Sequence, residues 1–304
     1  MATRIRESDE ASARGEGPGV PPDKTVGNGL PRKLLEGIPW SDRAEEDQTL
    51  CIAANRAGAF RVRNANGRTR ILGEDRSDLE VTAHKAARAE SLEAAAELLR
   101  EIRLVSKETP DGLELDVEAP RKSSRHGSAN LVIRLPRRMQ VAVDAANGRI
   151  DVEGIRGPVR ARSSNGCALI ADIVGAVEVV TTNAKVCCTG IRGRLTARSS
   201  NGKIEIEQHR GAVDASTSNG LIRAALLDLG PAGIQLATSN GGIELALPEG
   251  VDADVDIRVD NGTIRNERVL GQITRETPTR VVGRLGHGGA PIKLRTSNGS
   301  ILVR

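Results

Sequence analysis

Apolar and polar residues alternate in short segments that recur along most of the chain at a fixed step. In four consecutive segments from residue 141 onward, mostly apolar residues stand three and five places after an asparagine, a glycine ten places after it, and further apolar residues at twelve and fourteen places. One copy consists of Ile150, Val152, Gly157, Val159 and Ala161. Alternation with a period of two is typical of half-buried strands. Each unit is therefore predicted to be a short strand, a glycine turn, a second strand and an asparagine corner.

The asparagine corners define the period of the repeat. They follow one another at steps of eighteen and then twenty-one residues, with a longer gap before the last. The corners are Asn147, Asn165, Asn183, Asn201, Asn219, Asn240, Asn261 and Asn298. A fixed period of this size is the signature of stacked structural repeats. We predict an all-β fold, a β-solenoid or β-helix-like array of 18–21-residue units, with the asparagines stacked in a ladder of amide hydrogen bonds.

A second geometry fits the same pattern. Asn-Gly is the strongest short hairpin signal, because both residues accept positive φ, so an antiparallel β-meander is the alternative. Four successive steps of eighteen residues without an insertion favour stacking, because hairpin loops change length readily. In both geometries the asparagines are interpreted as structural corner residues whose amides satisfy turn backbone groups.

The chain before residue 141 departs from the regular array. Residues 1–48 are rich in Arg, Glu, Asp, Gly and Pro, and we expect them to be disordered because they bury too little apolar area to offset the entropy of ordering. Residues 49–140 are predicted to form an N-terminal cap of strands and one amphipathic helix at about 86–103, where apolar residues recur at helical spacing. Residues 141–304 then form the regular β-repeat array.

Composition narrows the classes of function. Aromatic residues make up 1% of the chain, so the stacking platforms of sequence-tolerant single-strand nucleic-acid binders are missing. The net charge of +4 comes from 44 basic and 40 acidic residues, which is a mild excess. No apolar stretch has the length of a transmembrane segment, about eighteen residues, and the N-terminus lacks the apolar core of a secretory signal. We expect a cytoplasmic protein, with the cell envelope as the alternative if an export signal is missing from the gene model.

The residue patterns of metal sites and active sites are weak. The four cysteines Cys51, Cys167, Cys187 and Cys188 lack the Cys-x-x-Cys or histidine spacing of zinc sites, and we expect no cofactor. A β-helix that acts on polysaccharides needs clustered carboxylates on one face, and the outward columns of the predicted array build up no such cluster. We therefore expect no enzyme and keep a polysaccharide-active β-helix enzyme as an alternative.

Arginines recur at equivalent positions of several units. Arg156, Arg192 and Arg210 share one position in the glycine turn, and Arg162 and Arg198 share an outward strand position. Guanidinium groups spaced by one strand, about 4.8 Å, or by two, could bind a phosphate or carboxylate polymer bidentately. The alternative is a solvated face diluted by neighbouring acidic residues. These five arginines are the candidate polyanion-binding edge.

The repeated phrases resemble a known family. These phrases, interleaved with Gly-x-x-Gly-x-Val, are similar to those of the bacterial DUF4097 family, described as a putative adhesin with β-strand repeats. They are Ser163–Gly166, Ser199–Ile204, Thr217–Ile222, Thr238–Ile243 and Thr296–Ile301. The resemblance covers about residues 58–304, including the helix insert. It implies an all-β repeat domain often associated with the cell envelope and envelope stress, with no established enzymatic activity and no catalytic residues to carry over.

Together these observations predict a non-enzymatic β-repeat scaffold with an adhesin-like binding role. Besides the enzyme, the remaining alternative is a self-assembling filament. In such a filament, copies would contact one another through the strand Ile301–Val303. This strand ends almost at the last residue and is expected to leave an uncovered edge. The partners considered are thus an anionic polymer and a second copy of the chain.

Overall fold

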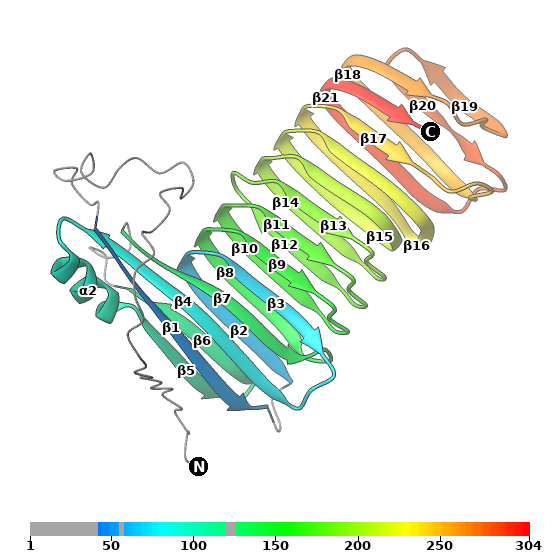
Figure 1. The fold of residues 1–304 in the computed structure, drawn as a ribbon. Coiled ribbons are helices and arrows are strands. Elements are labelled where there is room, and N and C mark those ends of the chain that lie inside the picture. Colours follow the sequence, from blue (N-terminus) through cyan, green and yellow to red (C-terminus); the bar gives the residue numbers. More distant parts are fainter. Residues whose placement is uncertain (1–41, 55–57, 120–125) are drawn as a thin grey trace, which may run out of the picture.

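The protein is a rod of stacked strands with one helix near its N-terminal end (Figure 1). The computed structural model describes residues 42–54, 58–119 and 126–304. From residue 140 to 246 the strands pair in parallel; Val159, for example, pairs with Val141 on one side and Val177 on the other. The predicted all-β repeat array is confirmed, and the antiparallel meander is wrong for this part of the chain. No helix in the described ranges is long and apolar enough to cross a membrane.

The strands of the array alternate between two faces. Face 1 is built by β8 (Gln140–Asn147), β10 (Val159–Asn165), β12 (Val177–Thr181), β14 (Leu195–Asn201) and the second halves of β15 (Ile204–Asn219) and β16 (Ile222–Asn240). Face 2 is built by β9 (Ile150–Glu153), β11 (Ala168–Ala171), β13 (Val186–Thr189), the first halves of β15 and β16, and β17 (Ile243–Ala246). The asparagine corner leads from face 1 to face 2, and the glycine turn leads back.

The core is the space between the two faces. Alternate residues of each strand point into it, so Ile150, Val152, Val159 and Ala161 are all buried. Because units pair in register, equivalent residues stack into columns of small aliphatic side chains. This arrangement explains how the chain forms one continuous core with hardly any aromatic residues.

At the N-terminal end the chain doubles back on itself. β2 (Ala59–Asn66) and β3 (Thr69–Glu74) lie directly below β8 and β9, and the later strands β6 (Gly112–Glu118) and β7 (Gly127–Pro136) form the next unit outward. Antiparallel strands finish this end: β5 (Arg103–Thr109) on face 1, and β4 (Asp78–Ala89) followed by β1 (Asp42–Ala53) on face 2.

Two predicted boundaries at this end differ from the structure. The segment expected to be disordered to residue 48 already enters β1 at Asp42, because that strand pairs with β4 along its whole length; residues 1–41 lie outside the described part. The helix α2 spans Leu92–Glu101, with Ser91 as its N-cap, and is shorter than the predicted 86–103. Residues 86–89 belong to β4, where pairing with β1 overrides their helical propensity.

The C-terminal end also departs from chain order. β18 (Ala253–Asn266) is followed by the antiparallel strands β20 (Arg280–Leu285) and, outermost, β19 (Gln272–Thr277). The last strand, β21 (Ala290–Val303), inserts between β18 and the pair β16 and β17. The sequence predicted a regular array up to residue 304, but the array is interrupted at this end. It also predicted an open edge at Ile301–Val303, but these residues belong to an interior strand.

One column of the core contains a histidine. His209 occupies the place that Ile155, Ile173 and Ile191 hold in the preceding units, and its side chain is fully buried. Although the backbones of Ala212 and Gly211 lie close to the ring, neither ring nitrogen has a hydrogen-bond partner among the described residues. Burial lowers the pKa of His209 below its ordinary value of 6.5, since the charged form is poorly solvated there.

We expect His209→Ile to stabilise the protein, because it removes a buried imidazole with no hydrogen-bond partner, which costs about 1–3 kcal/mol. The folded pKa lies below the unfolded one, so the unfolded state takes up the proton first as pH falls through about 6.5. Wild-type stability should therefore drop between neutral pH and pH 5, and that drop should shrink in the variant. Denaturant unfolding at both pH values measures it, with the exposed His287→Gln as control. Identical pH profiles for wild type and His209→Ile would contradict the prediction.

Candidate binding surfaces of the rod

The asparagine corners stack into one uninterrupted ladder. Each side-chain Nδ2 donates to the Oδ1 of the asparagine one unit nearer the N-terminal end of the rod, at 2.7–3.1 Å. In spatial order the members are Asn66, Asn147, Asn165, Asn183, Asn201, Asn219, Asn240, Asn298 and Asn261. Asn66 was missed as a member at the sequence level, although the Asn-Gly pair that it forms with Gly67 marks the corner.

The geometry of the ladder makes it structural. Every interior amide both donates and accepts, and all the bonds point the same way along the rod, so neighbouring bonds polarise one another. Where a corner has a positive φ, it falls on the glycine after the asparagine, as at Gly148 and Gly166, whereas Gly202 and Gly220 lack it. Among the described non-glycine residues only Asp172 and Gln208 have positive φ, so the asparagines are selected for their amide groups and not for their backbone conformation.

A second, buried ladder lies behind each corner. The residue two places before the asparagine is usually Ser or Thr, and in four units its hydroxyl donates to a carbonyl of the preceding corner. Thr181 instead donates within its own corner, and Ser163 has no hydrogen-bond partner. The clearest bonds are Thr217 to Gly202 at 3.1 Å, Thr238 to Gly220 at 3.2 Å and Thr296 to Gly241 at 2.9 Å. The recurring hydroxyl residue in the repeated phrase was a readable signal for this role.

The turn arginines line up along one edge of the rod. The turn residues Val174, Arg192 and Arg210 are bridged in parallel on successive units, and Arg156 precedes them in the same position one unit earlier. Arg156, Arg192 and Arg210 are exposed, and none forms an ion pair with a described residue. The strand spacing puts the Arg192 and Arg210 backbones about 4.8 Å apart. The edge therefore presents guanidinium groups that form no ion pair with the described part of the chain.

The other two candidate arginines differ. Arg162 lies 3.7 Å from a carboxylate oxygen of Glu178 and Arg198 lies 3.4 Å from one of Asp214. Both pairs lie on the outer surface of face 1, where solvent screens them. The structure thus divides the five predicted arginines into an unpaired set in the glycine turns and a paired set on the strands.

A shallow groove runs along face 1 beside the turn arginines. One concavity of 650 Å³ crosses β6, β2, β8, β10, β12 and β14, and a second of 150 Å³ continues it over β15, β16 and β21. Residues that follow the turn glycines contribute small side chains to the groove, among them Pro158, Ala176 and Ala212. Arg194 holds the equivalent position, lines both concavities and forms no ion pair within the described residues. Sequence reasoning missed Arg194, although its place after Gly193 was visible.

We use the name arginine edge for Arg156, Arg192, Arg194 and Arg210 together. These side chains come from three turns of the array, with Val174 in the turn between Arg156 and Arg192. Their spacing is therefore set by the strand spacing. Such a row fits an extended chain with repeated negative charges, because successive anionic groups of the ligand can each contact a guanidinium group.

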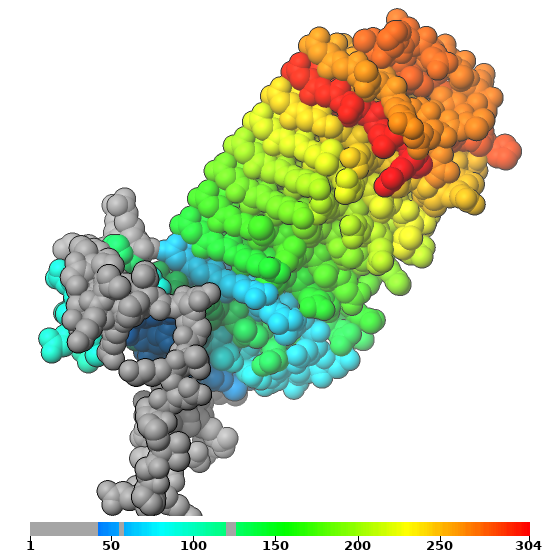
Figure 2. Space-filling view, turned by 45° about the horizontal axis from the view of Figure 1, so that its top comes forward, coloured from blue at the N-terminus to red at the C-terminus, as the bar shows by residue number. Residues whose placement is uncertain are grey.

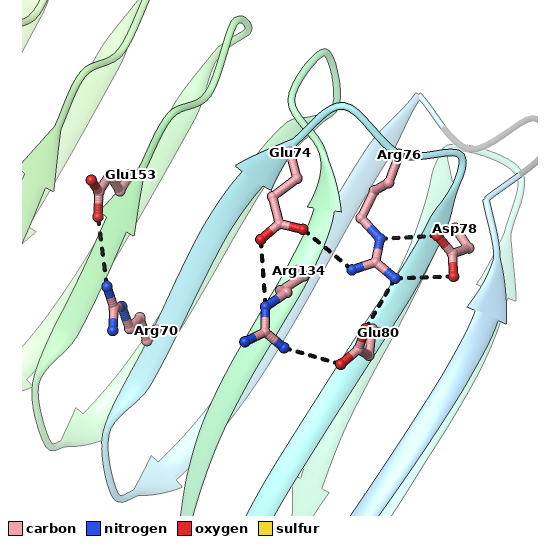
Figure 3. Close-up of polar contacts among 7 residues, drawn as sticks. All are labelled: Arg70, Glu74, Arg76, Asp78, Glu80, Arg134 and Glu153. Carbon is pink, nitrogen blue, oxygen red and sulfur yellow. Dashed lines mark hydrogen bonds and ion pairs between the residues drawn. The ribbon is translucent and has the colours of Figure 1, made fainter.

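A network of ion pairs on the outside of β3, β4 and β7 is saturated (Figure 3). Arg76 lies 2.9 Å from Asp78 and 3.1 Å from Glu80, and Arg134 lies 3.0 Å from Glu80. Glu74 contacts both arginines. The Arg76 guanidinium lowers the pKa of Asp78. This cluster ties three strands together and leaves no group unpaired for a ligand.

Two carboxylates of face 2, Asp151 and Glu205, are likewise held by basic neighbours. Asp151 accepts from Arg68 at 2.5 Å and from Arg149 at 2.6 Å. Glu205 lies 2.5 Å from both Lys185 and Lys203, and these ammonium groups lower its pKa to about 2. In register, Asp151 is beside Leu169, as the sequence predicted.

The cysteines are all free thiols. Cys188 is buried, Cys187 is half-buried and Cys167 is exposed, which matches the inward and outward positions read from the repeat. In the described part of the chain, no three His, Cys, Asp or Glu residues are placed to hold a metal ion.

Comparison with known proteins finds one family. The model of the family Toastrack DUF4097 matches residues 60–304, and no curated protein matches. Similar solved structures include a putative adhesin from Bacteroides fragilis (13% identity, 88% of this chain and 99% of that chain, TM-score 0.38). Others are a putative adhesin from Parabacteroides distasonis (9%, 85% and 97%, 0.33) and a putative cell adhesion protein from Clostridium sporogenes (10%, 86% and 99%, 0.28). Likeness this remote carries no argument about activity.

Proposed function

Since the chain belongs to the Toastrack DUF4097 family, we propose that it is a non-enzymatic β-repeat scaffold that binds a linear anionic polymer along the arginine edge. The observation that supports this is that, within the described residues, the turn arginines form no ion pair while most other basic groups do. A solvated structural face would gain from neighbouring carboxylates, as Arg162 does with Glu178. Among the described residues, no carboxylate lies within ion-pair distance of the arginine edge, although Asp228 is the register partner of Arg210 on the next unit.

The proposed ligand is a chain of phosphate or carboxylate groups. Guanidinium groups bind both bidentately, and the groove beside the edge, lined in part by small side chains, gives an extended polymer room to lie along the rod. Single contacts at such an exposed surface are weak. A polymer that meets several arginines at once binds tightly because each further contact is intramolecular.

The test compares two double variants with the same charge change. With long-chain inorganic polyphosphate as the probe, Arg192→Gln/Arg210→Gln should weaken binding by about tenfold, corresponding to ~1.4 kcal/mol. Arg162→Gln/Arg198→Gln should change it by less than about twofold, because these guanidinium groups are already partly neutralised. Calorimetric or anisotropy titrations at several salt concentrations measure both effects.

Two outcomes would contradict the proposal. One is an equal loss in both variants, which would mean that only total charge matters. The other is an affinity that does not fall with salt, because contacts between arginine and phosphate release counterions and must weaken as salt rises. Circular dichroism of both variants serves as the folding control.

A further inference from the structure

Both ends of the rod finish in strands with one open edge. On face 1, β5 pairs only with β6 at the N-terminal end, and β19 pairs only with β20 at the C-terminal end, as far as the described residues show. An unpaired strand edge offers a row of N–H and C=O groups for pairing with another chain. The two open strands have nearly equal length, with seven residues in β5 and six in β19.

The directions of these strands match across a head-to-tail contact. β19 is antiparallel to β20, which is antiparallel to β18, so β19 runs the same way as the array. β5 is antiparallel to β6, which is parallel to β2 and thus to the array. A second copy shifted along the rod axis therefore brings β19 and β5 together in opposite directions. Antiparallel pairing is the slightly more stable arrangement.

The ends are also stepped in opposite senses. Figure 2 shows the C-terminal end, where the orange segment lies beyond the red last strand. At the C-terminal end, β20 and β19 extend face 1 beyond β18, whereas face 2 stops at β18 itself. At the N-terminal end, β4 and β1 extend face 2 beyond β7, and only β5 extends face 1 beyond β6. When β19 meets β5, the projecting strands β4 and β1 of the second copy enter the recess on face 2 without overlap.

Charge and apolar exposure favour the same contact. β1, residues 90–101 and β5 together carry nine carboxylates, three arginines and one lysine, whereas residues 263–285 carry five arginines and two glutamates. The N-terminal end is thus acidic and the C-terminal end basic, which steers the two ends toward each other. Apolar side chains are exposed at both ends: Leu92 at 61% on α2, and Val269 at 90% and Ile273 at 52% near or on β19.

We propose that the protein associates head to tail with a second copy of itself, β19 of one copy pairing antiparallel with β5 of the next. Because the two surfaces differ, each added copy leaves a free end of each kind, so the contact repeats into an open filament. The joint lies at β19 and β5 and not at the C-terminal strand, which is enclosed. The proposal is independent of polymer binding at the arginine edge.

The test uses variants that block one end at a time in the full-length chain. Ile273→Glu places a negative charge on β19 opposite the acidic end, and Ser106→Lys places a positive charge on β5 opposite the basic end; both positions are exposed. The matched controls Ile273→Lys and Ser106→Glu make the same two sites polar with the complementary charge. Sedimentation velocity is measured over a series of protein and salt concentrations.

We expect the wild type and both controls to grow in mass with protein concentration and to dissociate as salt rises. Each blocked variant alone should stay monomeric, and their equimolar mixture should form a dimer and nothing larger, because one intact end remains on each. The proposal is overturned if the wild type is monomeric up to its solubility limit or if the mixture stays monomeric. It is equally overturned if Ser106→Lys assembles like the wild type, which would place β5 outside the contact.

Discussion

Gly166→Ala is expected to destabilise the protein by about 2–4 kcal/mol, the sum of backbone strain and overpacking. Gly166 follows a corner asparagine with φ +149, a conformation that residues with a Cβ rarely adopt. A methyl group there would also overlap the carbonyl oxygen of Gly148 in the preceding unit. The strain and the overlap both arise at an interior corner. The neighbouring units cannot move apart there without breaking the hydrogen bonds between their corner asparagines. Denaturant unfolding followed by circular dichroism measures the loss.

The chain contains its own matched control. Ala184 holds the same corner position one unit later, and its φ is not positive, so this corner has adopted a different local conformation. Ala184→Gly should cost no more than about 1 kcal/mol, the usual penalty for the added backbone freedom of glycine. If both substitutions had the same small effect on stability, the close approach of successive corners would not be the reason that glycine is required at position 166. Since repeat arrays can unfold in parts, a broadened transition for Gly166→Ala counts as destabilisation.

Lys293→Pro is the second substitution expected to have a large effect, on the order of 3 kcal/mol. Lys293 is exposed, but its strand β21 pairs with β16 on one side and β18 on the other. Proline removes a donor from the ladder and is found in sheets essentially at edges and bulges. A drop in the unfolding midpoint of the purified variant measures the effect.

The control for this prediction is Thr274→Pro. Thr274 is exposed and lies at the irregularity of β19, where the register with β20 skips from Ile273 to Arg275. Proline is tolerated at such a position, so stability should change by less than about 1 kcal/mol. Equal tolerance of both prolines would mean that β21 is not an interior strand, as the sequence alone suggested.

Most of the array could be predicted because each unit repeats the same local rules. The eighteen-residue step indicated that equivalent asparagines stack, and the alternation of apolar residues indicated which side chains, such as Ile150 and Cys188, point inward. These features depend on strand parity and on pairing between neighbours in the chain, which a sequence displays directly.

The candidate site could be predicted only in part. The shared turn position of Arg156, Arg192 and Arg210 was visible in the repeat, and so was the outward position of Arg162. Whether an arginine is paired depends on which carboxylate its side chain reaches across the surface. Glu178 lies on the unit next to Arg162, and that proximity is a property of the folded array.

The sequence by itself determined the repeat, its asparagine ladder and the composition of its core, because these follow from periodicities shorter than one unit and its neighbour. Only the tertiary structure decided the order of the strands at the two ends. Asn261 and Asn298 carry the same corner signal, yet Asn298 stacks directly on Asn240 and Asn261 lies beyond it. Both β18 and β21 carry an edge that could pair with β16 and β17. That β21 does so depends on the packing of whole strands and not on any local pattern.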